Sequence, residues 1–219
     1  MGLLEACLPR ATLDKAHSRV PGAITIPLFP LGTVLFPGGL LQLKLFEQRY
    51  LTMGKNCLRD NTPFGVCGIK EGNEVGAPAV PFTIGCVANI IHWDMPQLGI
   101  LHIIAAGQQR FHILNHSLQS DGLNIGNVEL IPDDEPQALT PEHQPCVAIL
   151  RAVIEGLGEQ HFQAPFQFDD ANWVGNRLAE SLPLPLAIKQ QLLEIRDAGA
   201  RLAILKSHLV NEGVISPSQ

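Results

Sequence analysis

Hydrophobic residues recur along the chain at two different spacings, and the spacing changes near residue 131. In the first part, short apolar runs alternate with polar positions and end at glycine, proline or asparagine. Residues 41–45, for example, alternate leucine with Gln42 and Lys44, which is the pattern of a strand with one buried face. In the second part, apolar residues recur every three or four positions, as they do on one face of a helix.

The first part of the chain predicts a β-barrel. Its apolar runs are rich in isoleucine, valine and phenylalanine, and short strands at such regular spacing are typical of a closed or nearly closed barrel of about six strands. Apolar side chains at helical spacing predict one short helix at residues 47–59. Residues 1–23 lack a clear period and are expected to form a tail or a short helix lying on the body. We predict strands at residues 24–28, 40–45, 64–69, 82–92, 99–106, 110–114 and 123–131.

The second part predicts a small helical bundle. An acidic, proline-flanked linker separates it from the barrel, and Thr140 and Asp170 are the predicted N-caps of its first two helices. Pro185 begins a third helix that we expect to continue to Leu209. Because this third helix has a long apolar stripe, we expect the two halves to form one cooperative unit. The predicted organisation is a tail at 1–23, a barrel at 24–131, a linker at 132–139, a bundle at 140–212 and a tail at 213–219.

The sequence resembles one known family from about Ile24 to Leu209. Residues 26–40 (IPLFPLGTVLFPGGL), followed by residues 45–50 (LFEQRY), resemble the opening signature of the Lon protease N-terminal substrate-binding domain, and in particular the stand-alone proteins built from that domain. In the family's strand Gly-Thr-x-Ala, Cys86 replaces the usual threonine. Three later segments are also similar: residues 64–66 with 71–76 (FGV, EGNEVG), 84–90 (IGCVANI) and 107–111 (GQQRF).

The resemblance implies an α+β fold, with a PUA-like β-barrel followed by a helical bundle. It also implies a non-catalytic module that binds unfolded or partly folded polypeptides, with a protease or a chaperone as a possible partner. Lon proteases carry an ATPase and a peptidase module, but the sequence has no G-x-x-x-x-G-K-[ST] phosphate loop. We therefore expect binding without cleavage, and no cofactor.

Amino-acid composition and net charge limit the classes of binding partner and the cellular compartment that we expect. Hydrophobic residues make up 46% of the 219 positions, which excludes a disordered chain. A net charge of −6 with scattered lysines and arginines disfavours nucleic acid. RNA binding remains an alternative, because PUA-like barrels can bind RNA. The five cysteines form no C-x-x-C pair, and we expect reduced thiols in the cytoplasm.

The start of the chain and one uncharged stretch bear on targeting. Residues 1–6 lack the cationic start of a signal peptide. Residues 20–43 carry no charge, but their prolines and glycines would interrupt a membrane helix. We therefore expect no membrane association, and the pattern leaves the oligomeric state open.

Candidate chemistry centres on His92, Trp93 and Asp94. His92 and Asp94 share one strand face, where the carboxylate could orient the imidazole, as in a hydrolase. No serine lies in a G-x-S-x-G elbow, and Cys86 lies in an apolar strand where a thiol is inert, so the hydrolase is the alternative. The preferred interpretation is a polypeptide-binding turn, residues 92–98, lying where the barrel meets the bundle. Its predicted contact residues are His92, Trp93, Asp94, Met95 and Gln97, with Trp173 as an anchor of the second helix or a groove residue.

Other polar residues are given structural roles. His112 and His116 lie on a predicted strand, about 13 Å apart at about 3.3 Å per residue, so we expect no metal site. Arg110 and Glu47 occur within apolar segments, and we expect both to be buried and hydrogen-bonded as part of the scaffold.

Overall fold

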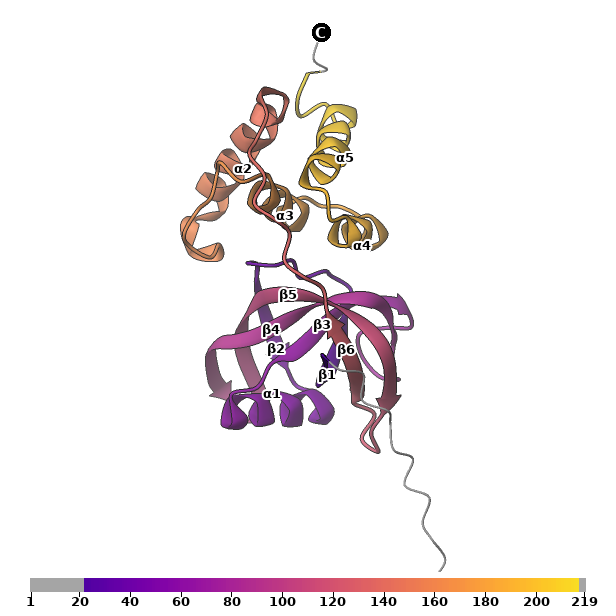
Figure 1. The fold of residues 1–219 in the computed structure, drawn as a ribbon. Helices are drawn as coiled ribbons and strands as arrows, with labels where there is room; N and C mark the ends of the chain where they lie inside the picture. The colour runs from indigo at the N-terminus through magenta and orange to yellow at the C-terminus, as the bar shows by residue number, and fades with distance from the viewer. Residues whose placement is uncertain (1–21, 217–219) are drawn as a thin grey trace, which may run out of the picture.

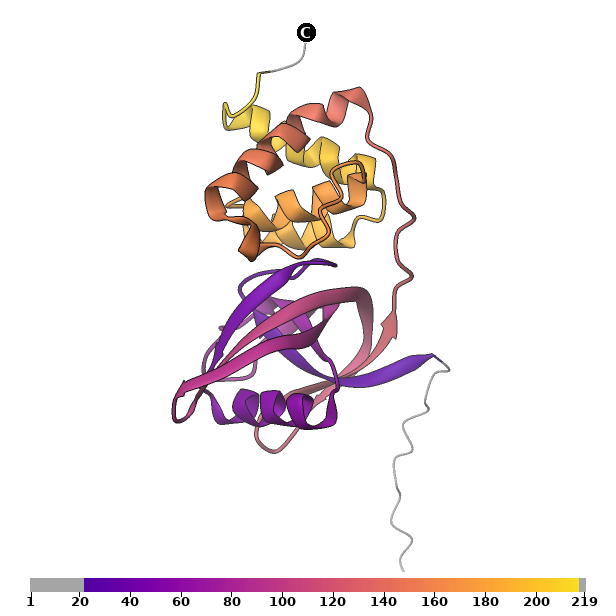
Figure 2. The same cartoon turned by 90° about the vertical axis from the view of Figure 1, so that its left-hand side faces the viewer.

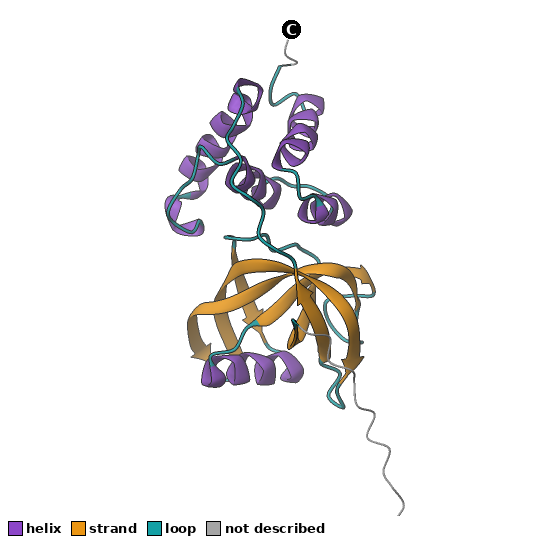
Figure 3. Ribbon diagram, viewed as in Figure 1, coloured by secondary structure: helices purple, strands orange, loops and turns teal. Residues whose placement is uncertain are grey.

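The computed structural model describes residues 22–216 and consists of a β-barrel with a helical bundle lying on one end of it (Figure 1). Figure 3 shows that all strands lie in the barrel and that helices form the bundle, apart from one helix at the opposite end of the barrel. Seen from the side, residues 131–140 run along one edge and connect the two halves (Figure 2). The predicted fold class is therefore confirmed.

The barrel is one mixed sheet of six strands in the order β2-β5-β4-β3-β1-β6, closed by a further pairing of β5 with β6. All pairs are antiparallel except β1 with β3. Strand β2 pairs only with β5 among the described residues, so it lies beside the closed ring rather than within it. The strands are β1 (Ala23–Leu31), β2 (Leu40–Leu45), β3 (Phe64–Glu71), β4 (Val80–Gln97), β5 (Ile100–Leu118) and β6 (Asn124–Leu130).

The strands predicted at 99–106 and 110–114 are one continuous strand, β5, and the predicted break was wrong. Gly107 is the first residue of the predicted break between these two strands. Its backbone N–H instead donates to the carbonyl oxygen of Gly39, at 2.8 Å. A side-chain Cβ at this position would lie 2.2 Å from the carbonyl oxygen of Phe36. This glycine therefore permits close approach of two backbone segments inside a strand.

Helix α1 (Gln48–Asp60) closes the end of the barrel away from the bundle. Tyr50, Leu51, Met53 and Cys57 on its buried face join the apolar barrel interior. The helix ends at Asn61, whose φ of 50° is the left-handed conformation common at helix C-termini. The predicted helix at 47–59 is thereby confirmed.

The bundle consists of four α-helices: α2 (Gln144–Leu157), α3 (Ala171–Ser181), α4 (Leu186–Glu194) and α5 (Ala198–Asn211). Single 3-10 turns at Pro141–His143 and Glu159–His161 flank α2. The side chain of Asp170 accepts a hydrogen bond from the Asn172 N–H, so it caps α3 as predicted. Thr140 occupies the N-cap position of the 3-10 turn that leads into α2, but its side chain makes no cap hydrogen bond.

The single helix predicted from Pro185 to Leu209 is also wrong, because the structure has two helices there. Helix α4 ends at Glu194, and Asp197 begins α5 by accepting a hydrogen bond from the Ala200 N–H at 2.8 Å. An aspartate directly before an alanine-rich segment is an ordinary N-cap signal. This signal was missed because the apolar residues keep the same helical spacing across the boundary between α4 and α5.

The barrel and the bundle share one apolar core. Val34 and Phe36, from the segment between β1 and β2, are buried in the same cluster as the leucines of α2 to α5. Ile84 of β4 packs against this cluster as well. The two halves are therefore joined by side-chain packing as well as by the connecting segment.

Candidate functional site

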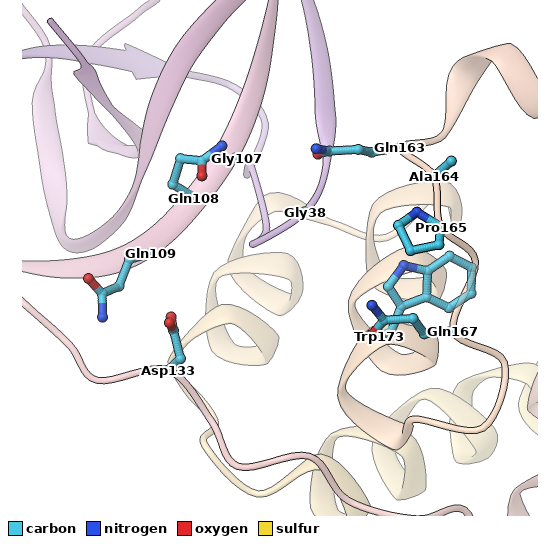
Figure 4. Close-up of a pocket in the computed structure, with 10 residues that line it drawn as sticks. All are labelled: Gly38, Gly107, Gln108, Gln109, Asp133, Gln163, Ala164, Pro165, Gln167 and Trp173. Atoms are coloured by element: carbon cyan, nitrogen blue, oxygen red, sulfur yellow. The ribbon is translucent and has the colours of Figure 1, made fainter.

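A cleft of about 550 Å³ lies where the barrel meets the bundle (Figure 4). This volume is within the range of about 300–1,000 Å³ that is usual for ligand pockets. Residues of β5 form one wall and the segment between α2 and α3 forms the other (Figure 4). The lining residues are Gly38, Gly107, Gln108, Gln109, Asp133, Gln163, Ala164, Pro165, Gln167 and Trp173.

Trp173 is held in the bundle wall of the junction cleft by two aromatic neighbours. Its ring centroid lies 5.1 Å from that of Phe168 in an edge-to-face arrangement and 5.9 Å from that of Phe166. The guanidinium of Arg151, on α2, lies 3.7 Å from the centroid of the Phe168 ring. Trp173 is only partly buried. It therefore serves both roles considered from the sequence, as an anchor of α3 and as a residue that lines a groove.

Four glutamines give the cleft its polar character: Gln108 and Gln109 on β5, and Gln163 and Gln167 between α2 and α3. Each amide offers both a donor and an acceptor, as a peptide group does. Asp133 is the only charged residue among the described residues that line this cleft. The cleft can thus hydrogen-bond a polypeptide backbone from both sides with little selection for side-chain charge.

Buried ionic groups position the loop that forms the floor of the cleft. Arg177 on α3 is 1% exposed, and its guanidinium donates to the carbonyl oxygens of Pro37, at 2.7 Å, and Gly38. Glu180, one turn further along α3, accepts from the Phe36 N–H at 3.1 Å and pairs with Arg177 at 3.1 Å. Burial raises the pKa of Glu180 to about 7, although Arg177, the Phe36 N–H and Lys189 act to lower it.

A second buried network surrounds the carboxylate of Asp134. Arg110 of β5 pairs with it at 2.5 Å and also donates to the carbonyl oxygens of Leu193 and Ile195, at the end of α4. Arg201 of α5 contacts the same carboxylate at 3.5 Å. Arg110 is therefore a buried, hydrogen-bonded scaffold residue, as expected, and it ties the barrel to α4. Glu47 is likewise paired, with Arg49 at 2.9 Å.

The segment predicted as a turn at residues 92–98 is mostly strand, and that prediction was wrong. Strand β4 continues to Gln97, and only Leu98 and Gly99 form the turn. The reason is pairing with β5, where Trp93 lies opposite Ile103 and Asp94 lies opposite His102. His92, Trp93, Asp94 and Gln97 are exposed, while Met95 is half-buried against the barrel interior.

The predicted location of Trp93 at the junction is also wrong. It lies in the distal part of the β4–β5 hairpin, which Figure 2 shows extending away from the bundle. Trp93 is 54% exposed and does not line the junction cleft, whereas Trp173 does. The two tryptophans therefore belong to separate surfaces.

His92 and Asp94 share one face of β4, as expected, and line a separate groove of about 430 Å³. Lys44 of β2 and His102 of β5 complete its polar lining. Among the described residues that line this groove, none carries a hydroxyl or thiol group that could act as a nucleophile. In residues 22–216, no three histidine, cysteine, aspartate or glutamate side chains gather as a metal site would require.

The cysteines of the described residues are free and buried, and none of the helices in this part of the chain is suited to spanning a membrane. Cys57, Cys67, Cys86 and Cys146 are buried and free of disulfides, and burial raises the pKa of the Cys86 thiol far above its ordinary value. Cys7 lies outside the described residues. Within the described part of the chain, every helix is too short or too polar to cross a membrane.

Comparison with known proteins assigns the family. Residues 25–211 match the family model of the ATP-dependent protease La (LON) substrate-binding domain, and the chain belongs to this family. The resemblance seen in the sequence is thereby confirmed. The crystal structure of a Lon N-terminal domain protein from Xanthomonas campestris superposes with a TM-score of 0.70 and 33% identity, covering 84% of this chain and 98% of that one.

Curated relatives are much longer than the part they share with this chain. A Lon protease from Anaeromyxobacter dehalogenans is 25% identical over 190 residues, which is 82% of this chain and 22% of the protease. Protein cereblon from Gallus gallus is 30% identical over 112 residues, 49% of this chain and 24% of that protein. The chain therefore spans about a quarter of the length of these relatives, and the match leaves out the catalytic modules of Lon.

The glutamines and Arg177 were missed by the sequence interpretation. Two signals were present: paired glutamines in residues 107–111 (GQQRF), and three glutamines interleaved with aromatic residues in residues 160–168 (QHFQAPFQF). They lie far apart in sequence, so only the fold brings them to opposite walls of one cleft.

Proposed function

We propose that this protein is a non-catalytic polypeptide-binding module that holds unfolded or partly folded segments in the junction cleft. The observation that carries the proposal is the lining of the cleft, with an aromatic side chain on one wall and amide groups on both. Trp173 offers a large, rigid surface to apolar side chains. The amides can satisfy peptide N–H and C=O groups that would otherwise lose water on binding.

Family membership supports the same function, since the matching family is defined by the substrate-binding domain of Lon. A module of this kind would hand its client to another protein, and a protease or a chaperone is the class of partner that uses unfolded chains. We propose a cytoplasmic location, and the four free cysteines of the described residues are consistent with a reducing compartment.

The experiment is a titration of the full chain into a fluorescein-labelled, permanently unfolded protein, followed by fluorescence anisotropy. We expect saturable binding, and the unlabelled native protein from which the unfolded probe is made should not compete. Trp173→Ala should weaken binding about tenfold or more, in the range of an aromatic hot spot. Trp93→Ala is the matched control, because it removes the same side chain from a surface outside the cleft.

Because Trp173 is partly buried, a second variant tests the cleft without disturbing α3. Gln163→Ala combined with Gln167→Ala removes two exposed amides from the same wall. We expect it to weaken binding several-fold while the melting temperature stays unchanged. Binding that is equal in the wild type, in Trp173→Ala and in this double variant would remove the junction cleft as the site.

A further inference from the structure

The barrel has an unpaired strand edge that no part of the proposed function uses. Strand β2 pairs with β5 through the register Leu40 opposite Ala106 to Leu45 opposite Leu101. The Gly107 N–H donates to the Gly39 carbonyl oxygen, which marks this pair as hydrogen-bonded. Since such pairs alternate along an antiparallel ladder, the N–H and C=O groups of Leu40, Gln42 and Lys44 point away from β5.

Nothing in residues 22–216 pairs with that edge. The facing part of β1 is unpaired on the same side, because β6 pairs with it only up to Leu28 and β3 occupies the other side of Phe29–Leu31. A slot of about 170 Å³ lies between these two strands. The volume is below that of a usual small-molecule pocket, about 300 Å³ or more, so it suits a single side chain.

The slot has apolar walls and carboxylates at its rim. Phe29, Leu31 and Leu43 line it, and the side chains of Phe46 and Val75 beside it are 55% and 58% exposed. Glu47 and Glu74 line it as well. Burial raises the pKa of the Tyr50 hydroxyl in the same slot; Arg49 opposes this, and Glu47 and Glu74 add to it. Both carboxylates line the same slot as the Tyr50 phenol.

The charged side chains that line the slot are Glu47, Glu74 and Lys44. Glu47 is paired with Arg49 at 2.9 Å. Glu74 accepts a hydrogen bond from the Gly32 N–H and has no cationic side chain within 4.0 Å among the described residues. A lysine or arginine could lay its aliphatic stem on Phe29 and Leu43 and bring its charge to Glu74, as amphipathic side chains do elsewhere.

We infer that β2 is a docking edge for an extended polypeptide segment, which adds as a further strand and inserts one basic side chain into the slot between β1 and β2. The occupant must be extended, because the free backbone groups of β2 alternate as a strand partner requires. It must be basic at the inserted position, because the slot carries an unpaired carboxylate. This inference rests on the proposed function and adds a second contact surface for the same class of ligand.

The test uses the full chain and a fluorescein-labelled nine-residue peptide of alternating valine and threonine with lysine at its centre. Two further peptides carry norleucine or glutamate in place of the lysine. We expect the lysine peptide to bind most tightly and the glutamate peptide most weakly. Its affinity advantage should shrink at high salt, because exposed charges are screened.

Two protein variants separate the backbone and charge contributions. Gln42→Pro removes one N–H from the free edge without removing a bond to β5, and proline is tolerated on edge strands; we expect about a tenfold loss of peptide affinity. Glu74→Gln keeps the acceptor for the Gly32 N–H but removes the charge. We expect it to reduce the affinity for the lysine peptide about threefold, typical of an exposed ion pair, and to leave the norleucine peptide unaffected.

Glu71→Gln is the matched control for charge, since Glu71 is exposed and does not line the slot. N-methylation of alternate residues of the peptide tests the edge without altering the protein. Methylation in one register should abolish binding, and methylation in the other should have little effect.

Three results would overturn the inference. One is equal binding of both N-methylated registers, and another is equal binding of the lysine and glutamate peptides. The third is a Gln42→Pro variant that changes the oligomeric state but not peptide affinity, which would assign the edge to a second copy of the chain. Because the proposed function is tested with Trp173→Ala and an unfolded protein, either idea can fail while the other stands.

Discussion

The interiors of the two halves differ from the junction between them. Aliphatic and aromatic side chains form the buried clusters of the barrel and the bundle, and each half also buries one arginine of its own, Arg49 in the barrel and Arg201 in the bundle. At the junction, Arg110 and Arg177 are 4% and 1% exposed, and both donate to backbone carbonyl oxygens across it. Apolar packing is non-directional, whereas a guanidinium binds oxygens in a fixed geometry. Apolar packing holds each half together, and Arg110 and Arg177 fix the orientation of one half relative to the other.

This difference matters for the cleft, because its two walls come from the two halves. Gln108 and Gln109 belong to the barrel, and Trp173 belongs to the bundle. A wall-to-wall distance set only by apolar contact would vary with small shifts in packing. With Arg177 bound to the backbone of the Pro37–Gly38 floor, the cleft is preorganised, which lowers the entropic cost of binding.

The largest expected effect comes from removing the bundle. A barrel ending at residue 131 would expose Val34, Phe36 and Ile84, which pack in the shared core. It would also leave the Arg110 guanidinium without its carbonyl partners. We expect this fragment to be poorly soluble or to melt at least about 10 °C below the full chain. Differential scanning calorimetry of both proteins measures this, and equal melting temperatures would refute the coupling of the two halves.

The second largest effect is expected from removing the hydrogen bonds and the ion pair of Arg110. Arg110→Met keeps an unbranched side chain but leaves the Asp134 carboxylate and the last carbonyls of α4 with fewer partners. We expect a loss of about 3 kcal/mol in the free energy of unfolding, as for other broken buried ion pairs. Urea denaturation measures it.

Arg59→Met is the matched control for this variant, because Arg59 pairs with Asp60 at the surface. We expect it to leave the free energy of unfolding unchanged within error. A similar loss in both variants would mean that the junction arginines have no special weight.

The smallest effect concerns pH. Burial raises the pKa of Glu180 to about 7 from an ordinary 4.5. The folded protein therefore binds more protons than the unfolded chain between these values, and stability falls as the pH rises through this window. We expect Glu180→Gln to remove a decrease of about 1–3 kcal/mol between pH 5 and pH 8.

The measurement is the unfolding free energy of each variant at several pH values. Glu155→Gln changes an exposed glutamate of α2 and should keep the wild-type pH dependence. If Glu180→Gln and the wild type have parallel profiles, Glu180 does not control the pH response of the junction.

Much of the fold could be predicted from the sequence because the two hydrophobic periods are local signals. Alternation over residues 41–45 and the helical period after residue 140 depend only on near neighbours in the chain. Asp170 as a helix cap is also local, since it bonds to the N–H two residues later. These elements needed no knowledge of the rest of the molecule.

Positions where a distant segment decides the local structure were mispredicted. A break between strands was predicted at residues 107–109, but β5 is continuous there, and Gly107 permits close approach of the Phe36 backbone from another segment. Residues 92–98 were predicted to form a turn, but pairing with β5 keeps residues 92–97 extended. In both cases tertiary contacts overrode local preference.

By itself, the sequence determined the family, the order of barrel and bundle, and the placement of most strands and helices, because these follow from motifs and short-range periodicity. Only the tertiary structure decided which polar residues meet. Arg110 finds its partners 24 and 85 residues away, and Arg177 finds the Pro37 carbonyl 140 residues away. The way the barrel closes also separates Trp93 from Trp173 and leaves one edge of β2 without a partner strand among residues 22–216. These long-range contacts depend on the tertiary fold, and a short-range hydrophobic period carries no information about them.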